Sequence, residues 1–327
     1  MPRLELDGLV VDAQPEETVL AALLRAGASI RSSCRAGACQ SCLLRATSGA
    51  PDPIGQQGLK DTLRERGYFL SCITPAASDL VLTQADADSL QVQTTIQDAS
   101  LISDSVLRLR LHTPEDLPYR AGQFINILRD DGLTRSYSLA SVPGLDSFLE
   151  LHVRLYPHGR MSGWLRTLGP GHTLTLRGPA GDCFYVAGRP AQPLLLLATG
   201  TGLAPLWGIA RDALQQGHHG PIVLLHGSRS LQGLYYQDEL RQLVQGQPAL
   251  RYMPCVLQDS PDLPADTFLG SLSQALQSHY PKLSGWRVFL CGSPDVVQSL
   301  RRQVFLAGAS RRDIAADAFV PAASVSS

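Results

Sequence analysis

Three cysteines within nine residues place the strongest constraint on how the N-terminal part of this chain can fold. Cys34, Cys39 and Cys42 lie in "SSCRAGACQSCLLRA" with the spacing C-x4-C-x2-C, and Cys72 follows in "YFLSCITP". The chain has seven cysteines, an odd number, and its first residues carry charges where a secretory signal would be basic and then apolar. We therefore expect a cytoplasmic protein, in which thiols stay reduced and clustered cysteines bind a metal in preference to forming disulfides.

The spacing of the cysteines separates iron from zinc. C-x4-C-x2-C with a distant fourth cysteine is the plant-type pattern of a [2Fe–2S] cluster. The small residues Ala36, Gly37 and Ala38 allow the loop to wrap round a cluster with its N–H groups toward the sulfurs. Four thiolates also suit zinc, but structural zinc sites usually show two C-x2-C pairs, and this stretch has one. The residues favour iron and leave zinc as the alternative. The predicted ligands are Cys34, Cys39, Cys42 and Cys72.

Length, charge and hydropathy narrow the choice of partners. A chain of 327 residues is long enough for two or three domains. Its 28 basic and 29 acidic residues give a net charge of -1, which lacks the basic footprint of proteins that bind nucleic acid or anionic lipid. The longest apolar run, residues 193–210, is broken by Gly200, Gly202 and Pro205 and is too short to span a bilayer. We expect small-molecule and protein partners, and neither nucleic acid nor membrane.

The pattern of predicted strands and helices changes twice along the chain. Residues 1–91 show two short strands around Asp7-Gly8, a helix in "EETVLAALLRAGA" and a strand in "DLVLTQADAD". Residues 92–189 contain alternating strands such as "VLRLRLHTP" and "SFLELHVRLYP", which predict a small antiparallel barrel or sandwich. Residues 190–327 alternate buried strands, such as "PLLLLATG" and "WRVFLCG", with helices, which predicts a doubly wound α/β domain. The predicted fold is multidomain, α+β and α/β.

Two stretches of the barrel have the residue types of a phosphate and ring site. In "RSYSLAS", Arg135 and Tyr137 share one face of a strand and Ser138 points to the other. In "HGRMSGWL", a helix start at Met161 and Ser162 would offer unpaired N–H groups to an anion. The alternative for each stretch is a surface arginine, a core tyrosine and an N-cap serine.

The α/β part has a glycine pair where nucleotides bind. Ligands of such sheets lie at the carboxyl ends of the strands, here "ATGTGLAP", "HGSRS" and "CGSPD". Gly200 and Gly202 would let the backbone approach a pyrophosphate at a helix start. The third glycine of the dehydrogenase fingerprint is missing, because Pro205 occupies its place.

Together these motifs resemble a known family. "RSYS", the G-x-x-S of "GRMS", "GTGLAP" and "CGSP" are similar to the flavin and nicotinamide motifs of the ferredoxin–NAD(P) reductase superfamily. The cysteine loop resembles the [2Fe–2S] ferredoxin domain of bacterial oxygenase reductases, with Gln40 where a glycine is common. The order resembles reductase components of ring-hydroxylating dioxygenases and multicomponent monooxygenases. The resemblance implies a β-grasp-like [2Fe–2S] domain at 1–91, an antiparallel β-barrel FAD domain at 92–189 and a doubly wound parallel NAD domain at 190–327.

The resemblance also implies roles for particular residues. Arg135 would contact the FAD pyrophosphate, Tyr137 would lie along the flavin, and Ser136 and Ser138 would complete that strand, with Ser138 near flavin N5. The ribityl and pyrophosphate groups would be held by His152, Val153, Arg154, Arg160, Met161 and Ser162. The NAD(P) pyrophosphate would be held by Thr199, Gly200, Thr201, Gly202 and Leu203. Cys291 and Gly292 would lie beside the nicotinamide, and Phe319 would cover a flavin face near Asp317. The resemblance thus implies Ser138, Cys291 and Phe319 as the catalytic residues. Inert core and plain strand positions are the alternatives for Cys291, Asp317 and Phe319.

The activity implied by the resemblance is electron transfer. Hydride would pass from NAD(P)H to FAD, and single electrons through the cluster to an oxygenase. No acidic residue closely follows the strand "PIVLLHGS", and Ser228 and Arg229 could accommodate a 2′-phosphate; NADH is nevertheless expected from the family, with NADPH as the alternative. A separate ferredoxin, cytochrome or deoxygenation enzyme is the alternative acceptor, and a zinc-binding redox-sensing adaptor is the alternative outside enzymes.

Overall fold

The computed structural model describes the chain except residues 31, 33–36, 38–41, 85–89, 114–116 and 320–327. Residues 1–89 and 90–327 form two compact units, which are described one at a time. Among the described residues, no helix has the length and apolar character needed to cross a bilayer.

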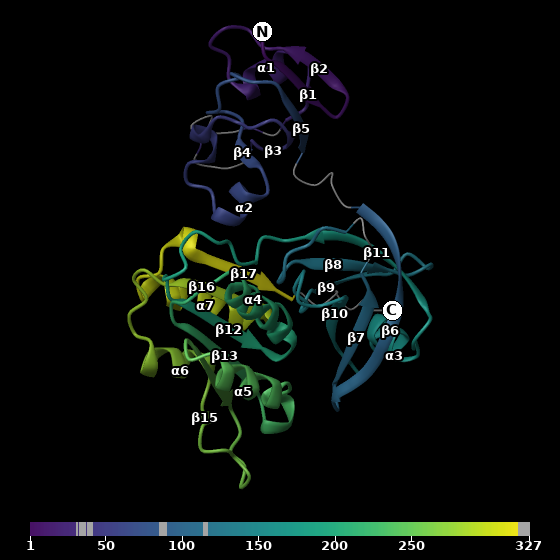
Figure 1. Cartoon of the computed structure of the whole chain (residues 1–327), viewed down its shortest axis with the longest axis vertical. Helices are drawn as coiled ribbons and strands as arrows, with labels where there is room; N and C mark the ends of the chain where they lie inside the picture. The colour runs from purple at the N-terminus through teal and green to yellow at the C-terminus, as the bar shows by residue number, and fades with distance from the viewer. Residues whose placement is uncertain (31, 33–36, 38–41, 85–89, 114–116, 320–327) are drawn as a thin grey trace. The chain divides into compact units, whose positions relative to one another are not determined.

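The first unit is a five-stranded mixed sheet with a helix packed on it (Figure 1). The strand order is β2-β1-β5-β3-β4. The β1–β2 turn has positive φ at Asp7 (50°) and Gly8 (86°), the conformation that a two-residue hairpin turn requires. Its elements are β1 (Arg3–Leu6), β2 (Leu9–Asp12), α1 (Val19–Arg25), β3 (Leu43–Ser48), η1 (Pro53–Gln56), α2 (Asp61–Glu65), β4 (Tyr68–Leu70) and β5 (Leu80–Gln84).

The predicted helix of this unit is confirmed as α1. It begins after Thr18, whose hydroxyl accepts a hydrogen bond from the Ala21 N–H at 3.2 Å, and the chain leaves it at Gly27 with φ of 89°. Val19 and Leu23 are buried in the core beneath the sheet. The amphipathic spacing therefore places α1 against β1, β2 and β5.

The second unit begins with a six-stranded antiparallel barrel. Its strand order is β10-β7-β6-β11-β8-β9, and a bridge between Leu139 and Leu151 joins the two ends, with the Ala140 N–H donating to the Glu150 carbonyl at 2.9 Å. The predicted strands are confirmed, but β6 was missed because its alternating polar residues resemble a linker. The elements are β6 (Leu90–Ser103), β7 (Val106–His112), β8 (Phe124–Leu128), β9 (Thr134–Ser138), β10 (Phe148–Arg154), α3 (Arg160–Arg166) and β11 (Thr173–Ala180).

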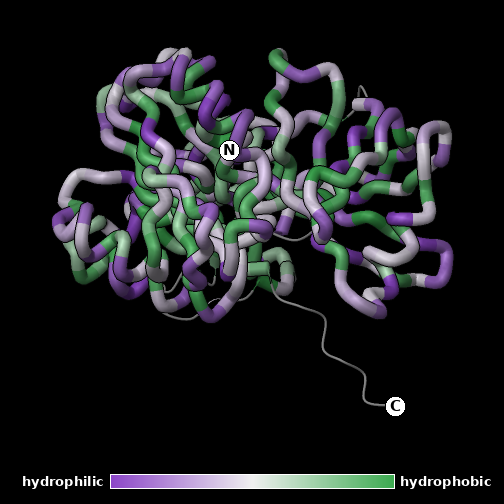
Figure 2. Tube along the Cα trace, turned by 90° about the horizontal axis from the view of Figure 1, so that it is seen from below, coloured by the Kyte–Doolittle hydropathy of each residue, from purple (hydrophilic) through white to green (hydrophobic). Residues whose placement is uncertain are grey.

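The remainder of the second unit is a doubly wound parallel sheet, which confirms the predicted fold class. The strand order is β15-β14-β13-β12-β16-β17. Alternate residues of β12 separate two cores: Leu196 packs toward α4 and α5, whereas Leu197 packs toward α6 and α7. In Figure 2, hydrophobic residues gather in the interior of the trace and many hydrophilic residues lie in its outer turns. The elements are β12 (Leu194–Thr199), η2 (Gly200–Gly202), α4 (Leu203–Gln215), β13 (Ile222–Ser228), η3 (Leu231–Gly233), α5 (Gln237–Gly246), β14 (Leu250–Val256), β15 (Phe268–Leu269), α6 (Leu272–His279), β16 (Arg287–Gly292), α7 (Pro294–Leu306), η4 (Arg311–Asp313) and β17 (Ile314–Ala318).

Candidate electron-transfer site

The β3–β4 hairpin brings two of the predicted cluster ligands together. Leu43 pairs with Leu70, so Cys42 and Cys72 flank the same end of the hairpin. Ser71 ties them further, because both its N–H (3.2 Å) and its hydroxyl (2.7 Å) donate to the Cys42 carbonyl. Both thiols are buried in one small apolar cluster. Cys34, Cys39 and Gln40 lie outside the described residues.

Gly37, the described residue between the first two cysteines, lies against this hairpin. Its φ is 75°, and a Cβ at this position would meet the Ile73 side chain at 2.9 Å, one residue from Cys72. A larger residue would have to adopt a left-handed conformation and push against Ile73. The backbone at Gly37 therefore lies close to the end of the hairpin that holds Cys72. The described residues fit a [2Fe–2S] cluster.

The flavin-motif strand β9 presents its residues on two faces, as predicted from its alternation. Ser138 is buried, and its hydroxyl donates to an Asp317 carboxylate oxygen at 3.2 Å. Tyr137 packs on the barrel core, and burial raises its pKa. Arg135 is partly exposed and donates to the Thr134 carbonyl at 2.7 Å, whereas the exposed Ser136 donates to Asn126 at 2.7 Å.

The second flavin motif lies at the start of α3, which begins at Arg160, one residue before the predicted start at Met161 and Ser162. Gly159 is the N-cap and Arg160 the first helical residue, so Ser162 is the third. The Ser162 hydroxyl accepts from the Tyr156 N–H at 3.3 Å, and a Cβ on Gly159 would meet this hydroxyl at 2.3 Å. Ser162 therefore fixes the turn before the helix and does not cap it. Met161 is buried beside it, and Arg160 is exposed and pairs with Asp131 at 3.1 Å.

Strand β10 is covered on both faces, which changes how its predicted flavin residues lie. Val153 packs in the barrel core. The His152 ring faces Tyr235, with Nδ1 2.9 Å from its hydroxyl and Nε2 3.1 Å from Glu150. The side chains of His152 and Val153 are therefore already engaged by the protein. Arg154, at the strand end, is exposed.

The glycine pair lies between β12 and α4, at the point where the strand order reverses. Gly200 has φ of 53°, and a Cβ on Gly202 would meet the Cys291 carbonyl oxygen at 2.1 Å. Gly292 packs as closely, because its Cβ would meet the Thr199 hydroxyl at 2.1 Å. Thr199 accepts from the Ser293 N–H at 2.9 Å, which fixes the ends of β12 and β16 together. The loop from Thr199 to Leu203 thus presents backbone at the carboxyl ends of the strands.

The predicted catalytic residues converge at the seam between the barrel and the parallel sheet. Asp317 lies beside Cys291 in the β16–β17 register, and the Phe319 N–H donates to the Gly292 carbonyl at 2.8 Å. Through the Ser138–Asp317 contact, the flavin strand meets the last strand of the nucleotide sheet. Burial raises the pKa of Asp317, the hydrogen bond from Ser138 lowers it, and the charge of Asp182 raises it.

Cys291 does not present its thiol to solvent. The side chain is fully buried and its Sγ lies 3.6 Å from the Cys183 Sγ. Burial and the Cys183 contact raise its pKa well above the ordinary range. The thiol is therefore protonated and unsuited to act as a nucleophile.

Ser228 and Arg229, the positions predicted to distinguish NADPH from NADH, lie at the end of β13. Arg229 is exposed, and its carbonyl accepts from the Gln258 N–H at 3.0 Å. Ser228 is partly buried, and a Cβ on Gly233 would meet its hydroxyl at 2.0 Å. The Ser228 hydroxyl is therefore held against the backbone of the next turn.

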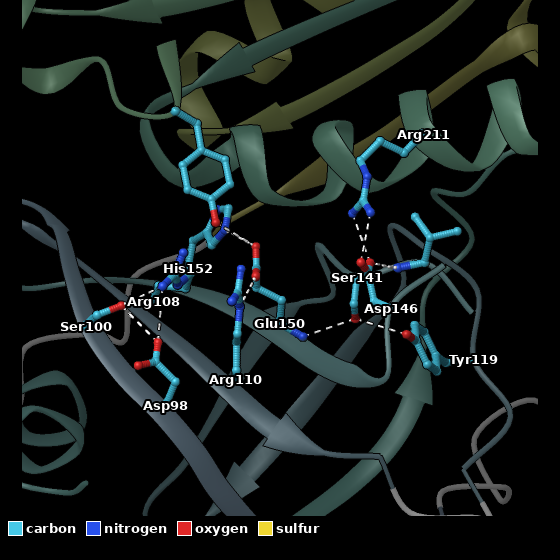
Figure 3. A network of polar contacts seen from close by, with 12 residues as sticks. Asp98, Ser100, Arg108, Arg110, Tyr119, Ser141, Asp146, Glu150, His152 and Arg211 are labelled. Atoms are coloured by element: carbon cyan, nitrogen blue, oxygen red, sulfur yellow. Dashed lines mark hydrogen bonds and ion pairs between the residues drawn. The ribbon is translucent and has the colours of Figure 1, made fainter. Parts of the chain in front are cut away.

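A buried polar network at the seam was missed by the sequence analysis. Glu150 accepts from Arg110 at 2.8 Å and from the Tyr236 hydroxyl at 2.8 Å, and it also contacts His152. A second contact pairs Arg211 of α4 with both oxygens of Asp146, at 2.8 and 2.9 Å (Figure 3). The sequence signal was the "YYQDEL" stretch, whose two large aromatic residues precede a polar helix.

Acid is expected to weaken the second unit through two groups of this seam. Burial lowers the pKa of His226 from 6.5 to about 4. Burial raises the pKa of Glu150, but hydrogen bonds from His152, Arg110 and Tyr236 outweigh it and lower the pKa from 4.5 to about 2. Between pH 6.5 and 4, the unfolded chain therefore binds a proton at His226 that the folded chain does not bind. The same difference holds for Glu150 between pH 4.5 and 2. Stability is full above pH 6.5 and falls with pH through these two windows.

Denaturant unfolding of the second unit between pH 7 and 5 measures the His226 contribution. At pH 5 it amounts to about 2 kcal/mol of unfolding free energy. A His226→Gln variant should show a shallower decline, because glutamine does not titrate. If the unfolding free energy falls equally steeply with pH in the wild type and in His226→Gln, His226 is not the group that titrates between pH 7 and 5.

Comparisons with known proteins agree with this arrangement. The family model of the 2Fe-2S iron-sulfur cluster binding domain matches residues 4–77. The model of the oxidoreductase FAD-binding domain matches residues 93–185, and the model of the oxidoreductase NAD-binding domain matches residues 196–302. The reductase component 2 of terephthalate 1,2-dioxygenase from Comamonas sp. is 33% identical over 315 residues, 93% of each chain. The reductase subunit of an aromatic O-demethylase from Amycolatopsis sp. is 34% identical over 337 residues, 96% of this chain and 97% of the relative. The crystal structure of the Amycolatopsis reductase GcoB superposes with a TM-score of 0.68 at 30% identity, over 98% and 99% of the two chains.

The chain combines a barrel that carries the flavin motifs, a parallel sheet that carries the nicotinamide motifs, and a strand pair, β3 and β4, that carries two of the cysteines. This combination defines an iron–sulfur flavoprotein oxidoreductase. The chain belongs to the ferredoxin–NAD(P) reductase superfamily, among the reductase components of ring-hydroxylating dioxygenases and related oxygenases. Its cofactors are a [2Fe–2S] cluster, FAD and NAD(P)H, which excludes the zinc-adaptor alternative.

Proposed function

We propose that this protein is a cytoplasmic NADH-dependent reductase that delivers electrons one at a time to an oxygenase component. The observation that carries the proposal is the Ser138–Asp317 contact, which joins the flavin strand of the barrel to the last strand of the nicotinamide sheet. Relatives named as reductase components of dioxygenase and O-demethylase systems support the oxygenase as acceptor. We further propose the division into domains 1–91, 92–189 and 190–327, each holding one sheet, although β6 begins two residues before the first boundary.

The chain's own residues serve the transfer by holding the two dinucleotides. Bound FAD accepts a hydride from NADH, and the cluster passes electrons on singly. Arg135, Tyr137 and the first turn of α3 bind the flavin side, together with the β10 backbone at His152, Val153 and Arg154. Thr199–Leu203 bind the nucleotide pyrophosphate, and Cys291, Gly292 and Phe319 border the nicotinamide. Ser138 would donate toward flavin N5 when it turns from Asp317, and burial, which raises the pKa of Asp317, disfavours a charge on that carboxyl.

Cluster ligation and nucleotide choice complete the proposal. The four ligands are Cys34, Cys39, Cys42 and Cys72. Arg229 and Ser228 border the adenosine ribose, and the hydroxyl of Ser228 is held against Gly233, which favours the smaller 2′-OH of NADH over a 2′-phosphate.

Anaerobic titration tests the function. With NADH, visible absorbance should bleach at the flavin bands and electron paramagnetic resonance should show one rhombic [2Fe–2S] signal. Reduction by NADH should be faster than by NADPH at equal concentration. A strong NADPH preference would overturn the nucleotide assignment, and a failure to reduce a Rieske or diiron oxygenase, with efficient reduction of a small ferredoxin, would overturn the acceptor.

Ser138→Ala is expected to slow flavin reduction by NADH. A lost hydrogen bond to a charged or developing charge costs about 1.5–3 kcal/mol, which corresponds to about 10- to 100-fold in rate. Stopped-flow absorbance at saturating NADH measures this rate. The control is Ser100→Ala, which removes a barrel hydroxyl that donates to Asp98 at 2.9 Å. An unchanged rate in Ser138→Ala, with normal FAD content, would remove Ser138 from the catalytic set.

A further inference from the structure

His226 is a buried histidine next to the glycine loop, residues 199–203, and it has no role in the predicted site. It lies near the carboxyl end of β13, fully buried, with Nε2 3.2 Å from the Gly200 carbonyl oxygen. In the described part of the chain, its Nδ1 has no hydrogen-bond partner. The proton is therefore on Nε2, and the ring donates to Gly200.

The Gly200 carbonyl oxygen is held by two donors. The Leu203 N–H also donates to it as η2 passes into α4. Two donors occupy the two lone pairs of a carbonyl oxygen and fix the orientation of its peptide plane. Gly200 is the first residue of η2 and has a left-handed φ of 53°, so this peptide lies where the chain turns from β12 into the helix.

The orientation of this peptide plane decides where the next N–H points. In a trans peptide, the Gly200 carbonyl and the Thr201 N–H lie in one plane and point in opposite directions. With the carbonyl held inward by His226, the Thr201 N–H points outward, to the side on which the carboxyl ends of the strands receive a ligand. Backbone N–H groups of this kind bind phosphate oxygens.

Tyr235, which is itself held by the barrel residue His152, keeps the His226 ring in place. The Tyr235 ring meets it edge-on, with centroids 5.6 Å apart at an interplanar angle of 87°. The Tyr235 hydroxyl is fixed by His152 at 2.9 Å, and His152 by Glu150 at 3.1 Å. A continuous set of buried contacts thus runs from strand β10 to the glycine loop.

We propose that His226 is a positioning residue for the dinucleotide pyrophosphate, because it turns the Gly200–Thr201 peptide so that the Thr201 N–H faces the phosphate. Tyr235 and His152 hold the imidazole at that angle. The inference rests on the proposed binding of the NAD pyrophosphate at Thr199–Leu203.

The test compares His226→Phe with His226→Gln. Phenylalanine keeps a planar ring against Tyr235 but removes the donor, whereas the glutamine amide nitrogen takes about the place of Nε2. We expect the Kd for NAD⁺, measured by calorimetry on the holoenzyme, to rise about 10-fold in His226→Phe and to recover most of that loss in His226→Gln. The KM for NADH should follow the Kd, and kcat should change less.

A matched control removes a different buried histidine. His218 also contacts a tyrosine hydroxyl, that of Tyr185 at 3.2 Å, and its Nε2 has no partner in the described residues. His218→Phe should leave the Kd for NAD⁺ unchanged. If His218→Phe raises the Kd for NAD⁺ as much as His226→Phe does, the proposal is overturned, because His226 then has a packing role only. The same conclusion follows if His226→Phe and His226→Gln lose equal affinity for NAD⁺.

Two further measurements separate the possible failures. If His226→Phe does not fold, nitrogen-15 spectra of the wild-type histidines decide: an Nε2–H tautomer that shifts with NAD⁺ supports the proposal, and an Nδ1–H tautomer overturns it. Gly202→Ala tests the pyrophosphate site itself. Unchanged NAD⁺ affinity in Gly202→Ala would reject the proposed nucleotide site, whereas weakened affinity there with unchanged affinity in His226→Phe would reject only the role of His226.

Discussion

A Gly202→Ala variant is expected to lose most of its affinity for NADH. The added Cβ would lie 2.1 Å from the Cys291 carbonyl oxygen and 2.8 Å from the Gly292 nitrogen, so the backbone of the loop or of β16 must move. Such overpacking costs about 1–3 kcal/mol or more. Because the displaced backbone is that which receives the pyrophosphate, we expect KM for NADH to rise about 10- to 100-fold. Steady-state reduction of ferricyanide over a range of NADH concentrations measures the change.

Gly246→Ala is the matched control for this variant. Gly246 ends α5 in the same sheet domain, and a Cβ there would meet no atom within 4 Å. Its KM for NADH should equal that of the wild type. A Gly202→Ala protein with normal KM would show that the contact between η2 and β16 does not shape the nucleotide site.

Cys72→Ser is expected to remove the cluster and leave the flavin reaction intact. Loss of an outer-shell partner of a metal ligand already costs about 10- to 100-fold in affinity or activity, so loss of a ligand itself should cost more. Reduction of a one-electron protein acceptor should fall by at least about 100-fold. Ferricyanide takes electrons without the cluster, and its reduction should persist.

The readouts for Cys72→Ser are iron content, the reduced-state paramagnetic signal and the two acceptor assays. The control is Cys255→Ser, since Cys255 is equally buried but lies in the nucleotide sheet, where burial raises its pKa to about 12. A Cys72→Ser protein that retains iron and acceptor reduction would reject Cys72 as a ligand. Parallel loss of ferricyanide reduction would instead point to a general folding defect.

Local sequence signals predicted most helices and strands of the fold, but they did not predict which of these elements contact one another. The strands β12 and β13 are continuous apolar runs, and Gly200 and Gly202 mark the turn that follows, so the parallel sheet could be predicted from short stretches. Strand β6 was missed because it is 14 residues long and rich in polar residues. It pairs with β11 at its start and with β7 at its end, so much of its stability comes from distant partners.

The candidate site shows the same limit. Cys42 and Cys72 were predicted together because thiolate chemistry restricts the spacing, and the β3–β4 pairing brings them to one end of the hairpin. The orientation of His152 could not be predicted. The sequence of β10 alternates, which predicts one exposed face, but both faces are buried in the structure, and the partner Tyr235 lies 83 residues away. The thiol of Cys291 likewise meets Cys183, 108 residues earlier.

The seam between the barrel and the parallel sheet makes these two parts a single cooperative folding unit. Glu150 and Asp146 of the barrel are bonded to Tyr236 and Arg211 of the nucleotide half, and both carboxylates are buried or nearly so. Separating the halves would remove Arg211 from Asp146, and breaking such a largely buried ion pair costs several kcal/mol. Glu150 would keep Arg110 and His152 within the barrel and would lose the Tyr236 hydroxyl. Heat should therefore release FAD and melt the nicotinamide sheet in one transition, and a truncated barrel should not hold flavin by itself.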